Sequence, residues 1–143
     1  MADTKELSAR LMAVQAYYQN TQNTKPVRQV VQEYLDHAPL VDVDGEALSK
    51  PQSLLFKRIL VSLDSRLAEV DELVKANVSA DKEVEPLLKA ILMCGVCEIL
   101  EHQDIDAPLI IDDYLNVTHA FYEKQQVALV NGMLDKISAL VRS

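Results

Sequence analysis

The sequence of 143 residues has no tryptophan, only three glycines and only two cysteines. Leucine, alanine, valine, glutamate and lysine are common instead, a mixture that favours helices over strands. Cys94 and Cys97 lie among apolar residues, which fits a reducing compartment better than a disulfide-bonded secreted scaffold. No apolar run reaches the roughly 18 residues of a membrane span, and the first residues lack the order of a signal peptide. We therefore expect a cytoplasmic protein that makes no membrane contact.

Positive charge is also scarce, since the net charge is -8. This excludes broad, unspecific attraction to nucleic acid, which depends on lysine and arginine. Residues 1–32 are the exception, because Lys5, Arg10, Lys25 and Arg28 give this segment a charge of +2. If the protein meets RNA, this segment is the first candidate, whereas the acidic remainder suits a basic protein partner.

Apolar residues recur at spacings of three and four along the chain, and no segment alternates long enough to form a strand. The pattern predicts a single all-helical domain, with a loop at 39–45 and short polar breaks at Ser79 and Asp81. The segment 87–100 is apolar nearly all round and is expected to be the central helix. The expected helices cover residues 4–20, 26–37, 53–77, 87–100, 110–121 and 127–141.

Several residue patterns allow a chemical and a structural interpretation. Cys94 and Cys97 have the C-x-x-C spacing of redox or zinc sites, but they lie in mid-helix, and packing is the favoured alternative. Glu98 needs a basic or N–H partner if it is buried. Asp112 and Asp113 fit acidic residues in the first turn of a helix better than a catalytic pair. Gly132 predicts close packing or a kink in the last helix.

No glycine-rich phosphate loop or nucleophile motif is present, and the three histidines are scattered singly. We therefore expect no enzyme, no catalytic residue, no metal and no cofactor.

The segment Leu129-Val130-Asn131-Gly132-Met133-Leu134-Asp135-Lys136 resembles the F-V-N-G-V-L-D-K block of the NusB family. Ala13-Val14-Gln15-Ala16 with Tyr18 resembles the family's A-V-Q-A-L-Y, and Glu98 resembles the acid of its Y-E-L. The segment from Ile111 to Phe121 resembles I-N-E-x-x-x-L-A-K-x-F. The resemblance implies an all-α NusB-like fold of about seven helices, forming one domain over 1–143. It also implies two packed bundles, an N-terminal one over about 1–78 and a C-terminal one over about 82–143.

The same resemblance implies a transcription antitermination factor. Family members bind single-stranded boxA RNA together with the ribosomal protein NusE, within the RNA polymerase antitermination complex. One alternative is a protein-interaction module or homodimer on the same fold with weak or lost RNA binding. Another is the NusB-like helical domain that precedes a ribosomal-RNA cytosine methyltransferase, although this chain has no cofactor-binding segment.

Candidate site residues follow from the resemblance and from the local charge. The RNA candidates are Lys5, Arg10, Gln15, Tyr17 and Tyr18. The candidates for the protein partner are Tyr18, Lys124, Gln125, Gln126 and Leu129.

Three of the RNA candidates have a structural alternative. Arg10 could form only an exposed helical ion pair with Glu6, and Tyr17 and Tyr18 could simply pack. If Arg10 contacts RNA, Arg10→Ala is expected to weaken RNA binding and to leave folding unchanged.

The chain departs from the family pattern at four places. Glu6-Leu7-Ser8 replaces several arginines, Gln125 replaces an acid, Leu129 replaces an aromatic residue, and Cys97 replaces a tyrosine. Leu129 cannot stack on a base as an aromatic ring would.

Overall fold

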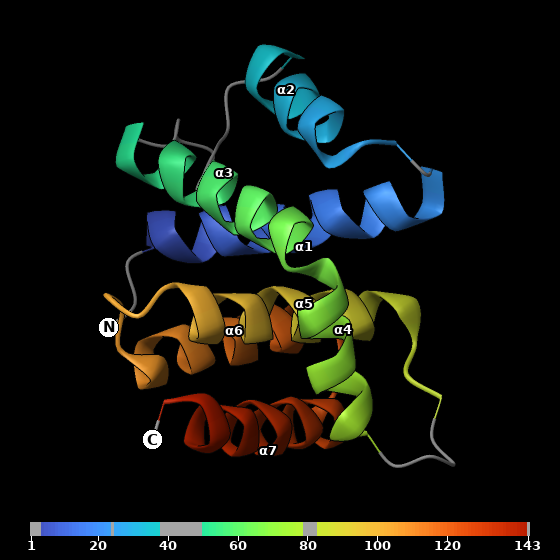
Figure 1. Cartoon of the computed structure of the whole chain (residues 1–143), viewed down its shortest axis with the longest axis vertical. Helices are drawn as coiled ribbons and strands as arrows, with labels where there is room; N and C mark the ends of the chain where they lie inside the picture. Colours follow the sequence, from blue (N-terminus) through green and yellow to red (C-terminus); the bar gives the residue numbers. More distant parts are fainter. Residues whose placement is uncertain (1–3, 24, 38–49, 79–82, 143) are drawn as a thin grey trace.

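The computed structural model describes residues 4–23, 25–37, 50–78 and 83–142, and these residues form seven helices and no strand (Figure 1). The all-α class is thereby confirmed, and so is the number of about seven helices that the family resemblance implies, whereas the apolar pattern predicts six. None of the described helices is long and apolar enough to cross a membrane. The expected loop at 39–45 and the break at 79–82 lie outside the described residues. The helices are α1 Thr4–Asn23, α2 Val27–His37, α3 Lys50–Ser65, α4 Leu67–Ala76, α5 Pro86–Glu101, α6 Ala107–Phe121 and α7 Lys124–Val141.

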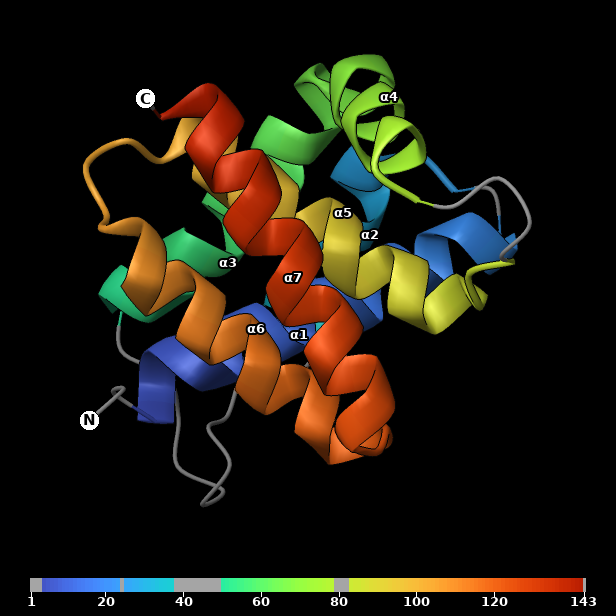
Figure 2. The ribbon, with the colours of Figure 1, turned by 90° about the horizontal axis from the view of Figure 1, so that it is seen from below.

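Helix α5 is the centre of the fold, as its apolar sequence predicts. It packs against α1, α3, α4, α6 and α7, which surround it in the two views of Figures 1 and 2. Every residue from Ala90 to Ile99 is buried. Pro86 occupies the start of the helix, where its missing N–H costs no helical hydrogen bond.

Helix α1 is more deeply buried than its apolar stripe predicts, because it packs against α2, α3, α5 and α6. Of the expected stripe only Val14 is fully buried, and Leu7, Leu11 and Tyr18 are partly exposed. The rest of the buried face consists mainly of residues that the stripe omits: Ser8, Ala9, Arg10, Ala13, Ala16 and Tyr17. Alanines allow the neighbouring helices to approach α1 closely, and this burial brings Arg10 into the interior.

The single long helix expected over 53–77 is wrong, because the chain turns at Arg66 between α3 and α4. The periodic apolar pattern conceals the turn, since Leu67 continues the stripe in the sequence but is 42% exposed in the structure. The Arg66 side chain pairs with Glu101 at 2.7 Å, which ties the corner to the end of α5. A tertiary contact therefore accompanies a break that the spacing of apolar residues does not reveal.

Gly132 does not have the close packing or kink expected of it. Helix α7 runs unbroken through it, and a Cβ atom at Gly132 would meet nothing within 4 Å. The close approach is at Gly95 in α5, where a Cβ would lie 3.2 Å from both terminal methyl groups of Leu134. The two-bundle division stays a prediction, and the buried residues of both halves belong to one continuous core.

Candidate functional site

A buried ionic centre joins α1, α5 and α6. The Arg10 guanidinium donates from Nε to Glu98 Oε2 at 2.8 Å and from Nη2 to Oε1 at 3.0 Å. Its Nη1 donates to Asp113 Oδ2 at 2.8 Å. Tyr114 donates its hydroxyl to Glu98 at 2.5 Å, and His102 Nδ1 lies 3.0 Å from the same carboxylate. The expectation that a buried Glu98 reaches a basic partner is confirmed.

The partners of Glu98 keep it ionised inside the protein. Burial raises its pKa, but hydrogen bonds from His102, Arg10 and Tyr114 outweigh burial, so the net pKa is lowered. Burial lowers the pKa of Arg10, yet the bond and charge of Glu98 leave it raised overall. For Asp113 burial dominates over the attraction of Arg10, and its pKa is raised. The bidentate Arg10–Glu98 pair is therefore the charged core of this centre.

The expectation of an exposed Arg10 side chain is wrong, since this residue is only 2% exposed. Glu6 Oε2 lies 4.0 Å from Arg10 Nη1, but Glu98 and Asp113 bind the guanidinium more closely. An effect of Arg10 on RNA binding would have to be indirect, through the position of α1. The burial of Arg10 contradicts the prediction that Arg10→Ala leaves folding unchanged, because removing one partner of a buried ion pair destabilises the fold.

Asp113 is also placed differently from expectation. Helix α6 begins at Ala107, so Asp112 and Asp113 lie beyond its first turn. Asp112 is exposed and Asp113 is buried against Arg10. Adjacent helical residues point in different directions, and here Asp113 faces the core while Asp112 faces solvent.

Arg142 is a structural residue that sequence reasoning does not identify. Its guanidinium donates to the backbone carbonyls of Ile99 at 2.7 Å, His102 at 2.8 Å and Ile105 at 2.7 Å. These carbonyls lie at and just beyond the carboxyl end of α5, where helical partners run out and positive charge is favoured. Its position soon after the V-N-G-M-L-D-K block is the one signal in the sequence.

Cys94 and Cys97 are free and buried in α5. Burial raises the pKa of the Cys94 thiol and raises that of Cys97 to about 12. This environment stabilises the thiol over the reactive thiolate and supports packing over redox chemistry. Among the described residues, no group of three or more His, Cys, Asp or Glu side chains is arranged so that it could hold a metal ion.

The RNA candidates on α1 differ in accessibility. Gln15 is exposed and Tyr18 is partly exposed. Tyr17 is only 9% exposed, and burial is the main reason that its pKa is raised to about 12. This burial contradicts the choice of Tyr17 as an RNA candidate and agrees with its packing alternative. The side chain of Lys5 lies outside the described residues.

The candidates at the start of α7 lie around one hollow of about 330 Å³. Lys124 is exposed beside it as the first residue of α7. Burial, followed by the Glu85 carboxylate, raises the pKa of Tyr122 to about 12, and Tyr18 contributes a smaller effect. The lining residues are the partner candidates Gln125, Gln126 and Leu129, together with Glu83, Glu85, Leu88 and Tyr122.

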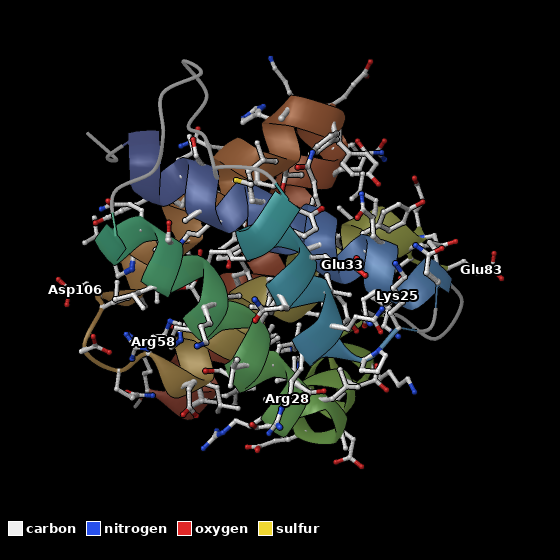
Figure 3. All side chains as sticks on the ribbon, turned by 90° about the horizontal axis from the view of Figure 1, so that it is seen from above. Lys25, Arg28, Glu33, Arg58, Glu83 and Asp106 are labelled. Carbon is white, nitrogen blue, oxygen red and sulfur yellow. The ribbon has the colours of Figure 1, made fainter. Side chains whose placement is uncertain are left out.

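The described basic side chains of residues 1–32, which are those of Arg10, Lys25 and Arg28, do not form a free positive patch. Arg10 is buried, and Lys25 Nζ lies 3.2 Å from the Glu33 carboxylate. Figure 3 shows Lys25 and Glu33 together, with Arg28 at a separate edge of α2. Two of the four cations therefore have their charge matched within the protein.

The structure thus defines an all-α domain whose charged centre is buried, so that binding partners contact its outer faces. The model of the NusB family matches residues 7–139, and the chain belongs to the NusB family.

Named relatives cover almost the whole chain. The transcription antitermination protein NusB of Allorhizobium ampelinum is 33% identical over 138 residues, which are 94% of this chain and 86% of that protein. The protein of the same name from Agrobacterium fabrum is 34% identical, over 94% of this chain and 84% of its own length.

Solved structures share the fold. T. maritima NusB superimposes with a TM-score of 0.78 at 19% identity, covering 97% of this chain and 93% of that one. A structure of the antitermination factors NusB and NusE in complex with dsRNA matches with a TM-score of 0.75 at 16% identity, covering 95% and 97%. These matches confirm the NusB-like fold.

Proposed function

We propose that this chain is a transcription antitermination factor. It binds boxA-type single-stranded RNA together with the ribosomal protein NusE, within the RNA polymerase antitermination complex in the cytoplasm, and it catalyses no reaction. The observation that carries this proposal is family membership over residues 7–139, with relatives that are themselves transcription antitermination proteins. A structural neighbour that contains NusB, NusE and RNA supports the choice of partners.

The surface proposed for this function is the α1–α7 face, which we define as Gln15 and Tyr18 of α1 with Lys124, Gln125, Gln126 and Leu129 of α7. Amide side chains can donate to and accept from the edges of unpaired bases, and a tyrosine ring can stack on them. Lys124 supplies positive charge for a phosphate. Glu83 and Glu85 make the adjoining rim acidic, which suits a basic protein and repels RNA. We therefore assign the Glu83–Glu85 rim to the protein partner and the Gln15 side to RNA, with Lys124 and Leu129 between them open to either.

A second candidate function is a protein-interaction module, or a homodimer, that has weak or lost RNA binding. The burial of Arg10, the pairing of Lys25 and the presence of Glu6-Leu7-Ser8 in place of arginines favour it. This alternative predicts that the chain binds protein partners, and that any RNA binding does not depend on the RNA sequence.

Fluorescence anisotropy of labelled boxA RNA separates the two. The titrations use the chain alone, NusE alone and the two together, each with a scrambled RNA of equal length as control. Antitermination predicts that the mixture binds boxA more tightly than either protein alone and more tightly than it binds the scrambled RNA. If the chain binds neither boxA RNA nor NusE, the proposal fails. Sedimentation of the chain alone identifies a homodimer.

A further inference from the structure

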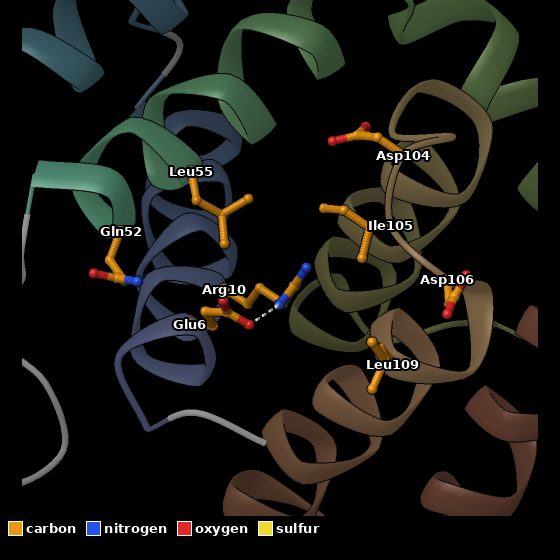
Figure 4. A pocket seen from close by; sticks show the side chains of 8 residues that line it. All are labelled: Glu6, Arg10, Gln52, Leu55, Asp104, Ile105, Asp106 and Leu109. Carbon is orange, nitrogen blue, oxygen red and sulfur yellow. Dashed lines mark ion pairs between the residues drawn. The ribbon is translucent and has the colours of Figure 1, made fainter. Parts of the chain in front are cut away.

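A second hollow, of about 370 Å³, lies between the first turns of α1 and α3 and the segment that joins α5 to α6 (Figure 4). We call it the acidic hollow. Its apolar lining consists of Leu55, Ile105 and Leu109, and its acidic lining of Glu6, Asp104 and Asp106, with Gln52 and the inner Arg10 completing it.

We propose that the acidic hollow binds a basic segment of a second protein partner. An apolar side chain of that segment enters between Leu55, Ile105 and Leu109, and neighbouring lysines or arginines meet the carboxylates of the rim. Neither the antitermination function nor the α1–α7 face requires this site.

The apolar part of the proposal rests on Leu109. This leucine is 59% exposed in the first turn of α6, and the partly buried Leu55 and Ile105 line the same hollow. A leucine-sized group placed there would cover apolar surface on three sides, which favours association.

The charge of the rim selects the partner. Arg10 already binds Glu98 and Asp113 at 2.8 Å, so its more distant contact with Glu6 leaves most of that carboxylate's charge uncompensated. Asp106 forms no ion pair with the described side chains, whereas Asp104 pairs with Arg58 at 2.7 Å.

Two exposed carboxylates beside an apolar hollow attract lysine and arginine and repel phosphate. The negative charge of these carboxylates disfavours the binding of RNA or of an acidic peptide. It also disfavours a second copy of this chain, whose net charge is -8.

The acidic hollow is well separated from the α1–α7 face. Leu109 lies in the first turn of α6 and Tyr122 directly follows its last residue, so at 1.5 Å per residue they are about 20 Å apart. Figure 3 shows Asp106 and Glu83, which line the two hollows, on opposite sides of the molecule. Both surfaces can therefore be occupied at once.

The test is a titration of the full ¹⁵N-labelled chain, followed by NMR, with the peptide acetyl-Lys-Lys-Leu-Lys-Lys-amide. Two control peptides replace the leucine with serine or the lysines with glutamates. We expect saturable shifts of amides near Glu6, Gln52 and residues 104–109 with the first peptide, weaker binding of the serine peptide and none of the glutamate peptide. Absence of saturation, equal binding of the serine peptide, or shifts spread over the acidic surface would overturn the proposal.

Two exposed-site variants sharpen the test without disturbing the core. Leu109→Ser is expected to weaken peptide binding about tenfold, and Asp106→Lys about threefold. The matched controls, Leu140→Ser and Asp135→Lys on α7, change a leucine of similar exposure (61%) and an exposed aspartate elsewhere. If the controls weaken binding as much as the variants of the hollow do, the site is wrong. RNA binding and NusE binding are measured separately for the same variants. These measurements test the proposed function independently of the acidic hollow.

Discussion

The buried ionic centre and the α1–α7 face use polar side chains in opposite ways. In the centre, Arg10, Glu98 and Asp113 carry formal charges and are at most 2% exposed. On the face, Gln15 and Leu129 carry none. The chain therefore buries a concentrated set of charges in its interior, and offers mainly neutral groups to solvent on the α1–α7 face.

This difference separates two roles within one helix. Arg10 fixes α1 against α5 and α6 through Glu98 and Asp113, and Gln15, five residues later, projects from the same helix into solvent. Substitutions in the centre should change stability first and binding only through the position of α1. Substitutions on the face should change binding and leave stability nearly untouched.

The largest effect is expected for Arg10→Ala, which leaves Glu98 and Asp113 buried without their cation. Breaking a buried ion pair in this way costs about 3 to 5 kcal/mol of unfolding free energy. Urea denaturation followed by circular dichroism measures the loss.

Arg58→Ala is the matched control, because Arg58 pairs with Asp104 at 2.7 Å but both side chains are exposed. It should cost about 1 kcal/mol or less, and 1 M salt should reduce this cost further. Equal losses for the two variants would remove the distinction between centre and surface.

A smaller effect is expected from pH. Because the pKa of Glu98 is lowered from 4.5 on folding, its ionised form contributes stability that is fully present above pH 4.5 and is lost as pH falls through the folded pKa. Asp113 acts in the opposite sense, since its pKa is raised. The stability gap between the wild type and Glu98→Gln isolates the contribution of Glu98. It should narrow below pH 4.5, and a gap that is constant from pH 7 to pH 3 would contradict the assignment.

On the face, Leu129→Phe tests whether a stacking surface can be supplied. Leu129 lines the hollow beside Tyr122 and Gln125 and is partly exposed. An aromatic ring there should tighten boxA RNA binding about fivefold, near the lower limit of what stacking on one base contributes. Anisotropy titrations measure the change, and Leu140→Phe, at an exposed position later in α7, serves as control. If both variants bind RNA like the wild type, Leu129 does not lie on a base.

The same contrast explains what the sequence could predict. Apolar spacing correctly indicated the all-helical class and the central α5, because both depend on where apolar residues recur. The same spacing places Arg10 at the surface, because arginine is usually exposed. Nothing near Arg10 in the sequence indicates that it pairs with Glu98, 88 positions away. The sequence feature that does indicate the buried side of α1 is its alanines at positions 9, 13 and 16, which are all buried. Apolar spacing does not predict the turn at Arg66 for a similar reason, because the ion pair between Arg66 and Glu101 is a tertiary contact.

The smallest effect concerns Gly95 and Gly132, which lie inside α5 and α7. Gly132 belongs to the exposed side of α7, and nothing lies within 4 Å of a Cβ placed there. Gly132→Ala should therefore raise the free energy of unfolding by about 0.5 to 1 kcal/mol, because alanine is the better helix former and loses less chain entropy.

Gly95→Ala is the matched variant in the buried part of the molecule. The same gain in helix propensity is opposed there by a Cβ at 3.2 Å from both methyl groups of Leu134, which must shift to accept it. Its unfolding free energy should rise less than that of Gly132→Ala, and Gly95→Val should lower it by about 1 to 3 kcal/mol through overpacking. Parallel urea denaturation of the three variants checks the order. If Gly95→Ala stabilises the chain as much as Gly132→Ala does, the packing of α5 against α7 leaves more room than the structure indicates.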